Sequence, residues 1–251
     1  MATCHRTGHL PCTCFERVDT WVFDLDNTLY PSQCNLFDQV SQRMGEFVSK
    51  ELGISLPEAK ALQRRYYHEH GTTLAGLMRV NQVDPHRFLA HVHDIDYSPV
   101  PAAPDLVRAL EQLPGRRIIF TNGSRRHAEK VAERLGATHL FADIFDIADA
   151  GFVPKPQAEA YHSFLASHGV DAATSAMFED LPQNLEAPHA LGMATVLVHT
   201  HLDDHPIYAA IRGWGSSPPA HVHHSTHDIA VFLAGMLETL GRSHTARSPA
   251  I

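Results

Sequence analysis

Residues 21–30 read Trp-Val-Phe-Asp-Leu-Asp-Asn-Thr-Leu-Tyr, and this stretch decides the fold. Its apolar beginning predicts a buried parallel strand. Asp24 and Asp26 follow that strand directly, at the edge where open parallel α/β sheets bind ligands. Two carboxylates this close repel each other unless a cation lies between them or one of them carries a proton. The pattern therefore favours a hard metal ion such as Mg²⁺ and a carboxylate that acts as a nucleophile.

The chain after this stretch has a helical pattern. From Leu36 to about Asp94, apolar residues recur at three- and four-residue steps, which predicts four helices. Ser55 and Glu58 have the spacing of a capping box, and the Asp84-Pro85 pair marks the start of the fourth helix. We therefore expect residues 32–98 to form an all-helical insertion.

From residue 99 the pattern changes to short apolar strands that alternate with helices. The strands are expected at residues 117–121, 144–147, 176–178 and 194–198, and the helices at residues 105–113, 125–135, 158–167, 185–191 and 228–240. Such alternation predicts a parallel sheet covered by helices on both faces. The expected fold is therefore α/β, with a Rossmann-like core formed by residues 19–31 and 99–245.

Polar residues follow each expected strand at the same edge of the sheet. Thr121 and Asn122 follow the second strand, Lys155 lies in the loop after the third, and Glu179 and Asp180 follow the fourth. Each residue alone has a simpler explanation, such as a helix N-cap for Thr121. In a parallel sheet, however, these loops converge. We expect one site in which acids for a metal meet a hydroxyl and an ammonium for a phosphate.

Composition limits the possible partners and the compartment. The 251 residues are 44% hydrophobic and 19% charged, as in an ordinary globular protein. The formal net charge of −8 argues against a nucleic acid or an anionic membrane as the main partner. The sequence contains neither an apolar run of the ~20 residues that cross a bilayer nor the apolar segment of a secretory signal at its start. We expect a cytoplasmic protein.

Cysteine and histidine each form one cluster outside the strand-end pattern. Three of the four cysteines lie within residues 1–18, which we interpret as a flexible leader rather than part of a disulfide framework. A second cluster, near the end of the chain, is interpreted as a solvated loop rather than a metal site; it consists of His221, His223, His224 and His227.

The ordered strand-end residues resemble the haloacid dehalogenase-like superfamily of phosphohydrolases over about residues 19–200. The motifs that carry the resemblance are FDLDNTLY (23–30), FTNGS (120–124), VPKP (153–156) and FEDLPQNLEAPHALGMATVLV (178–198). The helical insertion lies where that superfamily places its C1 cap. Residues 66–77 (YYHEHGTTLAGL) and the KPxxxxY pattern at 155–161 look like the pyrimidine 5′-nucleotidase branch.

The resemblance implies a covalent mechanism and a metal. Asp24 would be the nucleophile and would form an aspartyl-phosphate. Asp26 would protonate the leaving oxygen and then activate the hydrolytic water. Mg²⁺ would be bound by Asp24, by the backbone carbonyl of Asp26 and by Asp180, with Glu179 acting through water.

The resemblance also implies a phosphate site, in which Thr121 and Lys155 hold the transferring phosphoryl group with Asn122 close by. Because these residues grip only the phosphate, the helical insertion must select the substrate. Tyr30 is expected to line the mouth between core and insertion. A base or sugar would face a polar and aromatic run made of Tyr67, His70, Thr72 and Thr73. Alternatively, the tyrosine belongs to the core of the insertion and the threonines cap the next helix.

The expected function is that of a Mg²⁺-dependent phosphomonoesterase acting on a small soluble phosphate ester, with a pyrimidine nucleoside 5′-monophosphate as the first candidate. A phosphatase of a sugar phosphate or phosphoglycolate, or a phosphomutase, remains an alternative, and the oligomeric state stays open. A haloacid dehalogenase needs neither a metal nor a second aspartate, so Asp26, Glu179 and Asp180 argue against it. A catalytically inactive relative is disfavoured because the chain retains Asp24, Asp26, Thr121, Lys155 and Asp180.

Overall fold

A six-stranded sheet forms the centre of the computed structural model, which describes residues 14–199, 214 and 218–247. All neighbouring strands are parallel, in the order β3-β2-β1-β4-β5-β6. The strands are β1 (Thr20–Phe23), β2 (Arg116–Phe120), β3 (Asp143–Phe145), β4 (Ser175–Glu179), β5 (Ala194–Val198) and β6 (His224–Thr226). The parallel α/β architecture expected from the sequence is confirmed.

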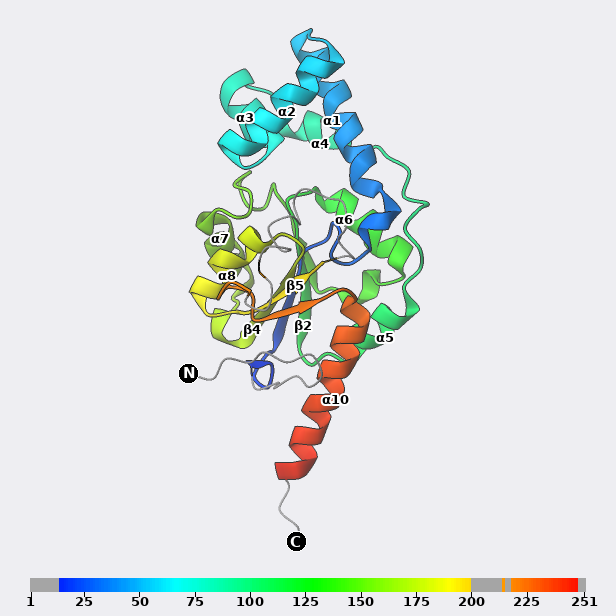
Figure 1. The fold of residues 1–251 in the computed structure, drawn as a ribbon, viewed down its shortest axis with the longest axis vertical. Coiled ribbons are helices and arrows are strands. Elements are labelled where there is room, and N and C mark those ends of the chain that lie inside the picture. The colour runs from blue at the N-terminus through cyan, green and yellow to red at the C-terminus, as the bar shows by residue number, and fades with distance from the viewer. Residues whose placement is uncertain (1–13, 200–213, 215–217, 248–251) are drawn as a thin grey trace.

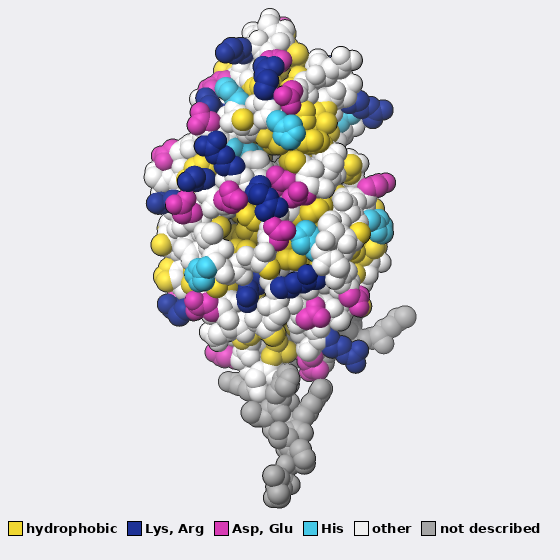
Figure 2. All heavy atoms as spheres, turned by 180° about the vertical axis from the view of Figure 1, so that it is seen from behind, with side chains coloured by type: hydrophobic (Ala, Val, Ile, Leu, Met, Phe, Trp, Pro, Cys, Tyr) yellow, Lys and Arg dark blue, Asp and Glu magenta, His cyan; other side chains and the backbone are white. Residues whose placement is uncertain are grey.

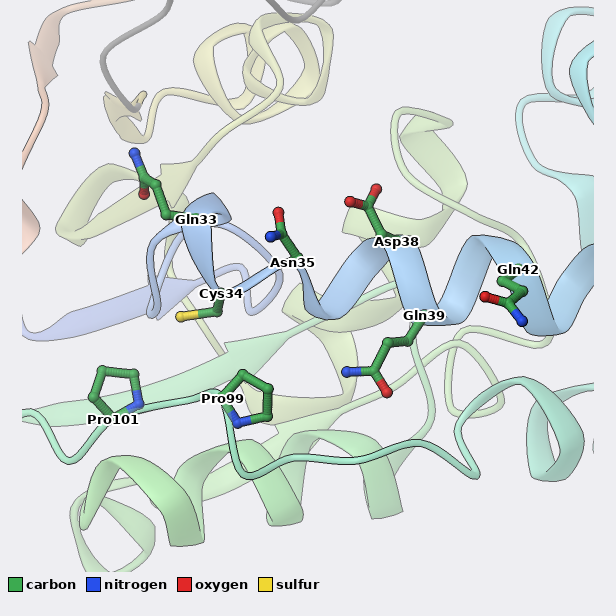
Figure 3. A pocket seen from close by; sticks show the side chains of 8 residues that line it. All are labelled: Gln33, Cys34, Asn35, Asp38, Gln39, Gln42, Pro99 and Pro101. Atoms are coloured by element: carbon green, nitrogen blue, oxygen red, sulfur yellow. The ribbon is translucent and has the colours of Figure 1, made fainter.

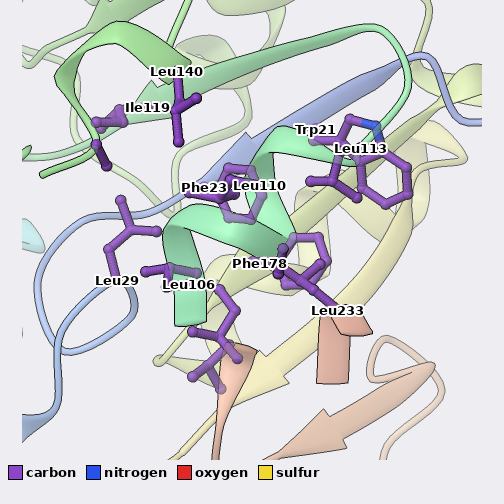
Figure 4. Close-up of a cluster of buried hydrophobic side chains, with 14 of the residues drawn as sticks. Trp21, Phe23, Leu29, Leu106, Leu110, Leu113, Ile119, Leu140, Phe178 and Leu233 are labelled. Carbon is purple, nitrogen blue, oxygen red and sulfur yellow. The ribbon is translucent and has the colours of Figure 1, made fainter. Parts of the chain in front are cut away.

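Helices cover both faces of the sheet (Figure 1). This cover is needed because successive side chains of β1 are apolar and point to opposite faces. Trp21 and Phe23 point to the face covered by α5 (Pro104–Glu111), α6 (Arg125–Leu135) and α10 (Ile229–Arg247). This apolar cluster is drawn in Figure 4. Val22 points to the opposite face, where it packs with residues of α7 (Ala158–His168) and next to α8 (Glu186–Leu191). Burial on both sides explains why the strands read as unbroken apolar runs.

Four helices are present where the sequence predicted four. They are α1 (Leu36–Leu52), α2 (Leu56–His70), α3 (Thr73–Asn81) and α4 (Pro85–Val92). We call residues 36–92 the helical insert; Figure 1 shows it at one end of the molecule. The expected capping box is confirmed, because the Ser55 side chain accepts from the Glu58 amide while the Glu58 carboxylate accepts from the Ser55 amide. The insert has its own apolar core, in which Tyr66 and Leu77 are buried.

A groove lies where the chain enters and leaves the helical insert (Figure 3). Its volume is about 600 Å³, and polar side chains form most of its lining. The lining residues are Gln33, Cys34, Asn35, Asp38, Gln39, Gln42, Pro99 and Pro101. This set shares no residue with the expected site, so the groove is separate from it.

The structure differs from the sequence interpretation near both ends of the chain. Phe15, which we assigned to a flexible leader, is only 1% exposed and packs with Trp21 and Phe232. A lone aromatic residue in a polar stretch gives no periodic signal. Residues 1–13 of that leader lie outside the described residues. His224, assigned to a solvated loop, begins β6, which pairs with β5. Three residues are too few to show a strand pattern.

Two features of the structure concern a nucleic acid or a membrane as partner: the distribution of surface charge and the length and polarity of the helices. Figure 2 shows Lys and Arg side chains interspersed with Asp and Glu over one face of the molecule. Within residues 14–199, 214 and 218–247, the structure contains no helix that is both long enough and apolar enough to cross a membrane.

Candidate active site

The carboxyl ends of three neighbouring strands bring the predicted residues together. β1 pairs with β2 on one side and with β4 on the other, so the loops that follow these strands lie next to one another. Asp24 directly follows β1, and its amide donates to the carbonyl of Phe178 in β4 at 2.9 Å. Thr121 directly follows β2, and Asp180 directly follows β4. The three residues are 1–6% exposed.

The Lys155 ammonium lies at the centre of this site and is almost fully buried. Its Nζ atom donates to Oδ1 of Asp24 at 2.6 Å, to Oε1 of Glu179 at 2.8 Å and to the carbonyl of Phe120 at 3.0 Å. Burial lowers the pKa of Lys155, but the two carboxylates outweigh burial and raise it above its usual range. The side chain is therefore a fixed positive charge.

Asn122 holds the backbone of Lys155 with two reciprocal hydrogen bonds. Its Oδ1 accepts from the Lys155 amide at 2.9 Å, and its Nδ2 donates to the Lys155 carbonyl at 3.1 Å. This pairing links the loop after β2 to the loop that carries the lysine. Asn122 thus has a positioning contact that the sequence did not reveal.

The Asp24 carboxylate is held on both of its oxygens. Lys155 donates to Oδ1, and the Thr28 hydroxyl donates to Oδ2 at 3.1 Å. Burial and the charge of Glu179 raise the pKa of Asp24 to about 7, although Lys155 works against them. The carboxylate is therefore oriented, dry and close to its ionisation point at neutral pH.

Three buried carboxylates lie close enough together to bind a metal ion. They form the one such cluster of Asp, Glu, His or Cys side chains among residues 14–199, 214 and 218–247. One oxygen each from Asp24, Glu179 and Asp180 lies within 4.8 Å of the others. Burial and the charges of Glu179 and Asp24 raise the pKa of Asp180 well above its ordinary value. With all three ionised, the single ammonium of Lys155 leaves an excess of two negative charges. A divalent cation would balance this excess.

The oxygen atoms of this cluster fit Mg²⁺, with some carboxylates suited to direct contact and Glu179 to an indirect one. Both oxygens of Glu179 already accept hydrogen bonds, Oε1 from Lys155 and from Nδ2 of Asn184 at 2.6 Å, and Oε2 from the Leu181 amide at 2.7 Å. Glu179 thus accepts three hydrogen bonds and Asp24 only two, which agrees with the indirect role expected for Glu179. The carboxylates of Asp24 and Asp180 could hold the ion, together with the backbone carbonyl of Asp26 expected from the family resemblance. An all-oxygen set of this kind favours Mg²⁺.

Asp26 lies at the more open side of the site, with its side chain 24% exposed. Its Oδ1 atom accepts from the Tyr30 hydroxyl at 2.5 Å and lies 2.8 Å from Nε2 of His127. Burial raises the pKa of Asp26, but the charge and the hydrogen bond of His127 outweigh it and hold the pKa at about 2. Without substrate, Asp26 is therefore an ionised carboxylate.

The residues expected to face the substrate have mixed positions. Tyr30 is only 2% exposed and is directed to Asp26, so it does not line an open mouth. Tyr67 is 40% exposed, and Tyr66 is the tyrosine buried in the insert. The pKa of Tyr67 is raised by partial burial and by the nearby charge of Asp180, against a hydrogen bond with Gln183. Tyr67 therefore extends from α2 toward the site.

Thr72 and Thr121, both expected to bind substrate, each accept a hydrogen bond from a backbone amide. The Thr72 side chain is the N-cap of α3 and accepts from the Ala75 amide at 3.1 Å, as the alternative interpretation holds. Thr121 lies at the site, where its hydroxyl accepts from the Gly123 amide at 2.9 Å.

Sequence reasoning missed His127 and Asn184, which hold Asp26 and Glu179 respectively. A signal for His127 does exist. It is the third residue of α6, on the buried face with Ala128 and Val131, where a polar residue needs a partner. Asn184 lies in a short 3₁₀ turn; the motif at 178–198 contains this residue, but the sequence assigned no role to it.

The family model of the haloacid dehalogenase-like hydrolases matches residues 18–192. This is more than half of the chain, so the protein belongs to that hydrolase family. The match begins just before β1 and ends after α8, and it therefore contains every element that contributes a residue to the site.

The chain is also similar to a yeast protein over 70% of its length. "Phosphate metabolism protein 8" of Saccharomyces cerevisiae (strain ATCC 204508 / S288c) is 28% identical over 194 residues, which cover 70% of this chain and 60% of that protein. The chain thus matches less than two thirds of this relative's length.

Two solved structures share the fold. The 2-haloacid dehalogenase of Pseudomonas syringae pv. Tomato DC3000 superposes with a TM-score of 0.55 at 18% identity, covering 90% of this chain and 99% of that one. A haloacid dehalogenase (HAD) family hydrolase of Deinococcus radiodurans R1 was solved with bound phosphate and sodium. It superposes with a TM-score of 0.53 at 21% identity, covering 90% of this chain and 97% of that one.

Proposed function

We propose that the protein is a Mg²⁺-dependent phosphomonoesterase that works through a phosphorylated Asp24. The observation that carries this proposal is the setting of the Asp24 carboxylate: buried, held by Lys155 and Thr28, and within reach of Asp180. Phosphoryl transfer mainly needs positioning and neutralisation of charge. A fixed ammonium supplies part of that charge, and Mg²⁺ would supply electrostatic stabilisation of the phosphoryl oxygens when bound.

The reaction divides into two steps. In the first, Asp24 attacks phosphorus, the bond from phosphorus to the leaving oxygen breaks, and Asp26 gives its proton to that oxygen. In the second, Asp26 takes a proton from water, whose oxygen attacks phosphorus and releases Asp24. Asp26 must be protonated for the first step, and the charge of a phosphate ester beside it would raise its pKa from its low value.

The proposed substrate is a small phosphate ester, with a pyrimidine nucleoside 5′-monophosphate as the first candidate. We propose that residues 32–98 act as a cap over a core formed by residues 19–31 and 99–245, and that the cap reads the part of the substrate beyond the phosphate. Tyr67 supports this proposal because it is 40% exposed and forms a hydrogen bond with Gln183, in the 3₁₀ turn that follows β4. A tyrosine ring in that place offers a stacking surface for a base.

A haloacid dehalogenase shares the fold but is the weaker candidate. That reaction leaves Asp180 and the Asp26–His127 pair without a use, whereas a phosphatase uses the acid cluster for a cation and Asp26 for proton transfer. A phosphatase for a sugar phosphate or phosphoglycolate differs only in what the insert contacts.

Release of inorganic phosphate tests the proposal. The purified chain is incubated with p-nitrophenyl phosphate and with a panel of nucleoside, sugar and carboxylic-acid monophosphates, in Mg²⁺ and in EDTA, and with 2-chloropropionate for halide release. We expect phosphate release in Mg²⁺ alone, with the highest kcat/KM for a pyrimidine nucleoside monophosphate. Halide release in EDTA without phosphatase activity would establish the dehalogenase instead. Release from sugar phosphates alone would overturn the nucleotide assignment and keep the phosphatase.

A further inference from the structure

We propose that His127 is a positioning residue that fixes the acid/base carboxyl of Asp26 for transfer of a proton to the leaving oxygen. The inference rests on the proposed function and adds a residue from α6 that takes no direct part in holding phosphate or metal. Its basis is a chain of contacts that begins at Asp26 and ends in the segment between α4 and α5.

The first contact fixes the orientation of the carboxyl group. Nε2 of His127 lies 2.8 Å from Oδ1 of Asp26, and the Tyr30 hydroxyl donates to the same oxygen at 2.5 Å. Two partners on one oxygen set both the rotamer and the plane of the carboxyl. Neither contact involves Oδ2, which leaves that oxygen for proton transfer. Proton transfer requires a donor within hydrogen-bond reach of the leaving oxygen, so a fixed carboxyl is a catalytic advantage.

His127 is itself held on its other sides. The imidazole is 1% exposed, and its Nδ1 atom lies 3.0 Å from the Tyr97 hydroxyl. Its ring stacks on the His93 ring with centroids 4.4 Å apart and planes inclined by 12°. Nδ1 of His93 lies 2.7 Å from Oγ of Ser124, the N-cap residue of α6. The imidazole is therefore held through both of its nitrogens and one face of its ring.

The supporting residues come from the segment that leads back from the helical insert. His93 is the C-cap of α4, and the Tyr97 hydroxyl donates to the His93 carbonyl at 3.0 Å. The position of Asp26 thus depends on how this return segment sits on α6. A conventional core histidine would need partners for its two nitrogens, but not a partner that is the acid of the reaction.

The leaving group separates a positioning role from a structural one. An alkyl oxygen leaves poorly without a proton, whereas p-nitrophenolate leaves readily and needs little general acid. The ratio kcat/KM reports the steps up to the first irreversible one, here cleavage of the phosphorus–oxygen bond, so a slow second step does not obscure it. Loss of positioning lowers kcat/KM for the alkyl ester selectively, while general damage to the site lowers both values alike.

The experiment compares His127→Phe and His127→Gln with the wild-type protein, using uridine 5′-monophosphate and p-nitrophenyl phosphate in Mg²⁺. His127→Phe should lower kcat/KM about 10²-fold on the alkyl ester, the lower range for a general acid, and less than about 3-fold on the aryl ester, with the loss in kcat rather than in KM. His127→Gln keeps a donor near Asp26 and should recover part of the loss. His139→Phe, at an exposed histidine, is the matched control and should change neither value.

Tyr97→Phe keeps the packing and removes one hydroxyl, so it serves if His127→Phe does not fold. It should also lower kcat/KM selectively for the alkyl ester, but by a smaller factor of about 3- to 10-fold. Equal losses on both esters, or no loss on either, would overturn the role of His127 while the phosphatase stands. Absence of phosphate release by the wild-type protein would instead overturn the proposed function, and the inference with it.

Discussion

The Nζ atom of Lys155 lies 2.6 Å from Oδ1 of Asp24, and both side chains are buried. The same ammonium donates to Glu179, so one positive charge serves two carboxylates. A buried ion pair contributes little net stability when compared with an apolar pair, but removing one partner leaves an uncompensated charge. Lys155 therefore supports the fold as well as the proposed chemistry.

Replacement of this lysine should destabilise the protein strongly. We expect Lys155→Met to lower the free energy of unfolding by about 3–5 kcal/mol at neutral pH, because Asp24 and Glu179 lose their buried counter-charge. Urea denaturation in EDTA measures the change. The matched control is Lys130→Met, since the exposed pair of Lys130 with Glu133 contributes no more than about 1 kcal/mol. Equal effects of the two substitutions would show that Asp24 and Glu179 do not depend on the charge of Lys155 for stability.

Removal of metal should abolish turnover. The cluster of Asp24, Glu179 and Asp180 contains oxygen ligands, with an excess of negative charge that Lys155 balances only in part. We expect no phosphate release in EDTA and full recovery on addition of Mg²⁺. Zn²⁺ should restore less, because the site offers neither sulfur nor imidazole. Undiminished activity in EDTA would contradict the assignment of these carboxylates to a cation.

The contribution of Asp24 to the stability of the metal-free protein should fall as pH rises from 5 to 7. The pKa of Asp24 is about 7 in the folded protein against a usual 3.8, so the folded state keeps a proton that the unfolded state has lost. For a raised pKa, the stabilising contribution is complete below the unfolded value and is lost as pH rises through the folded value, by at most about 1.4 kcal/mol per pH unit.

The test of this pH dependence is a difference between two proteins. Urea unfolding of wild type and Asp24→Asn in EDTA, at pH 5 and pH 7, cancels the contribution of the many histidines. The wild type should lose more stability than the variant over this range. An equal or smaller loss in the wild type would mean that the pKa of Asp24 is not raised in the folded protein. Mg²⁺ should remove the difference, because the ion favours the ionised carboxylate.

Tyr67 should affect specificity more than phosphate handling. We expect Tyr67→Ala to raise KM for uridine 5′-monophosphate about 10-fold and to leave KM for p-nitrophenyl phosphate within about 2-fold, since a small aryl ester needs little from the insert. Leu56→Ala is a matched control, because Leu56 is also on α2 and is similarly exposed at 42%. Equal changes on both substrates would leave the nucleotide assignment without support from the insert.

The strand-end residues could be read from the sequence because their positions follow from topology. Once β1, β2 and β4 are parallel neighbours, Asp24, Thr121 and Asp180 must meet at one edge. The helices were also accessible, since Ser55 and Asp84 mark two helix starts by local chemistry. Local patterns and one topological rule thus account for most of the fold.

Side-chain partners over long separations in the sequence could not be read in the same way. His127 lies 101 residues from Asp26, and no spacing rule connects them. The orientation of Tyr30 was also hidden: both a substrate-facing and a buried position fit its place after the acidic motif, and only the packed structure turns its hydroxyl to Asp26. Phe15 joins the core through contacts with distant aromatic rings, such as that of Phe232.

The central claim is that Asp24 becomes phosphorylated during turnover, and mass spectrometry after rapid quenching tests it most directly. Wild-type protein and Asp24→Asn are mixed with p-nitrophenyl phosphate and Mg²⁺, quenched in acid within the first turnovers and digested. Asp26→Asn is included because the second step needs Asp26 as a base, so the intermediate should accumulate in this variant. We predict the mass of one phosphoryl group on the peptide that contains residue 24, strongest in Asp26→Asn and absent in Asp24→Asn. Turnover by Asp24→Asn at the wild-type rate, or a phosphoryl group on another residue, would contradict the account.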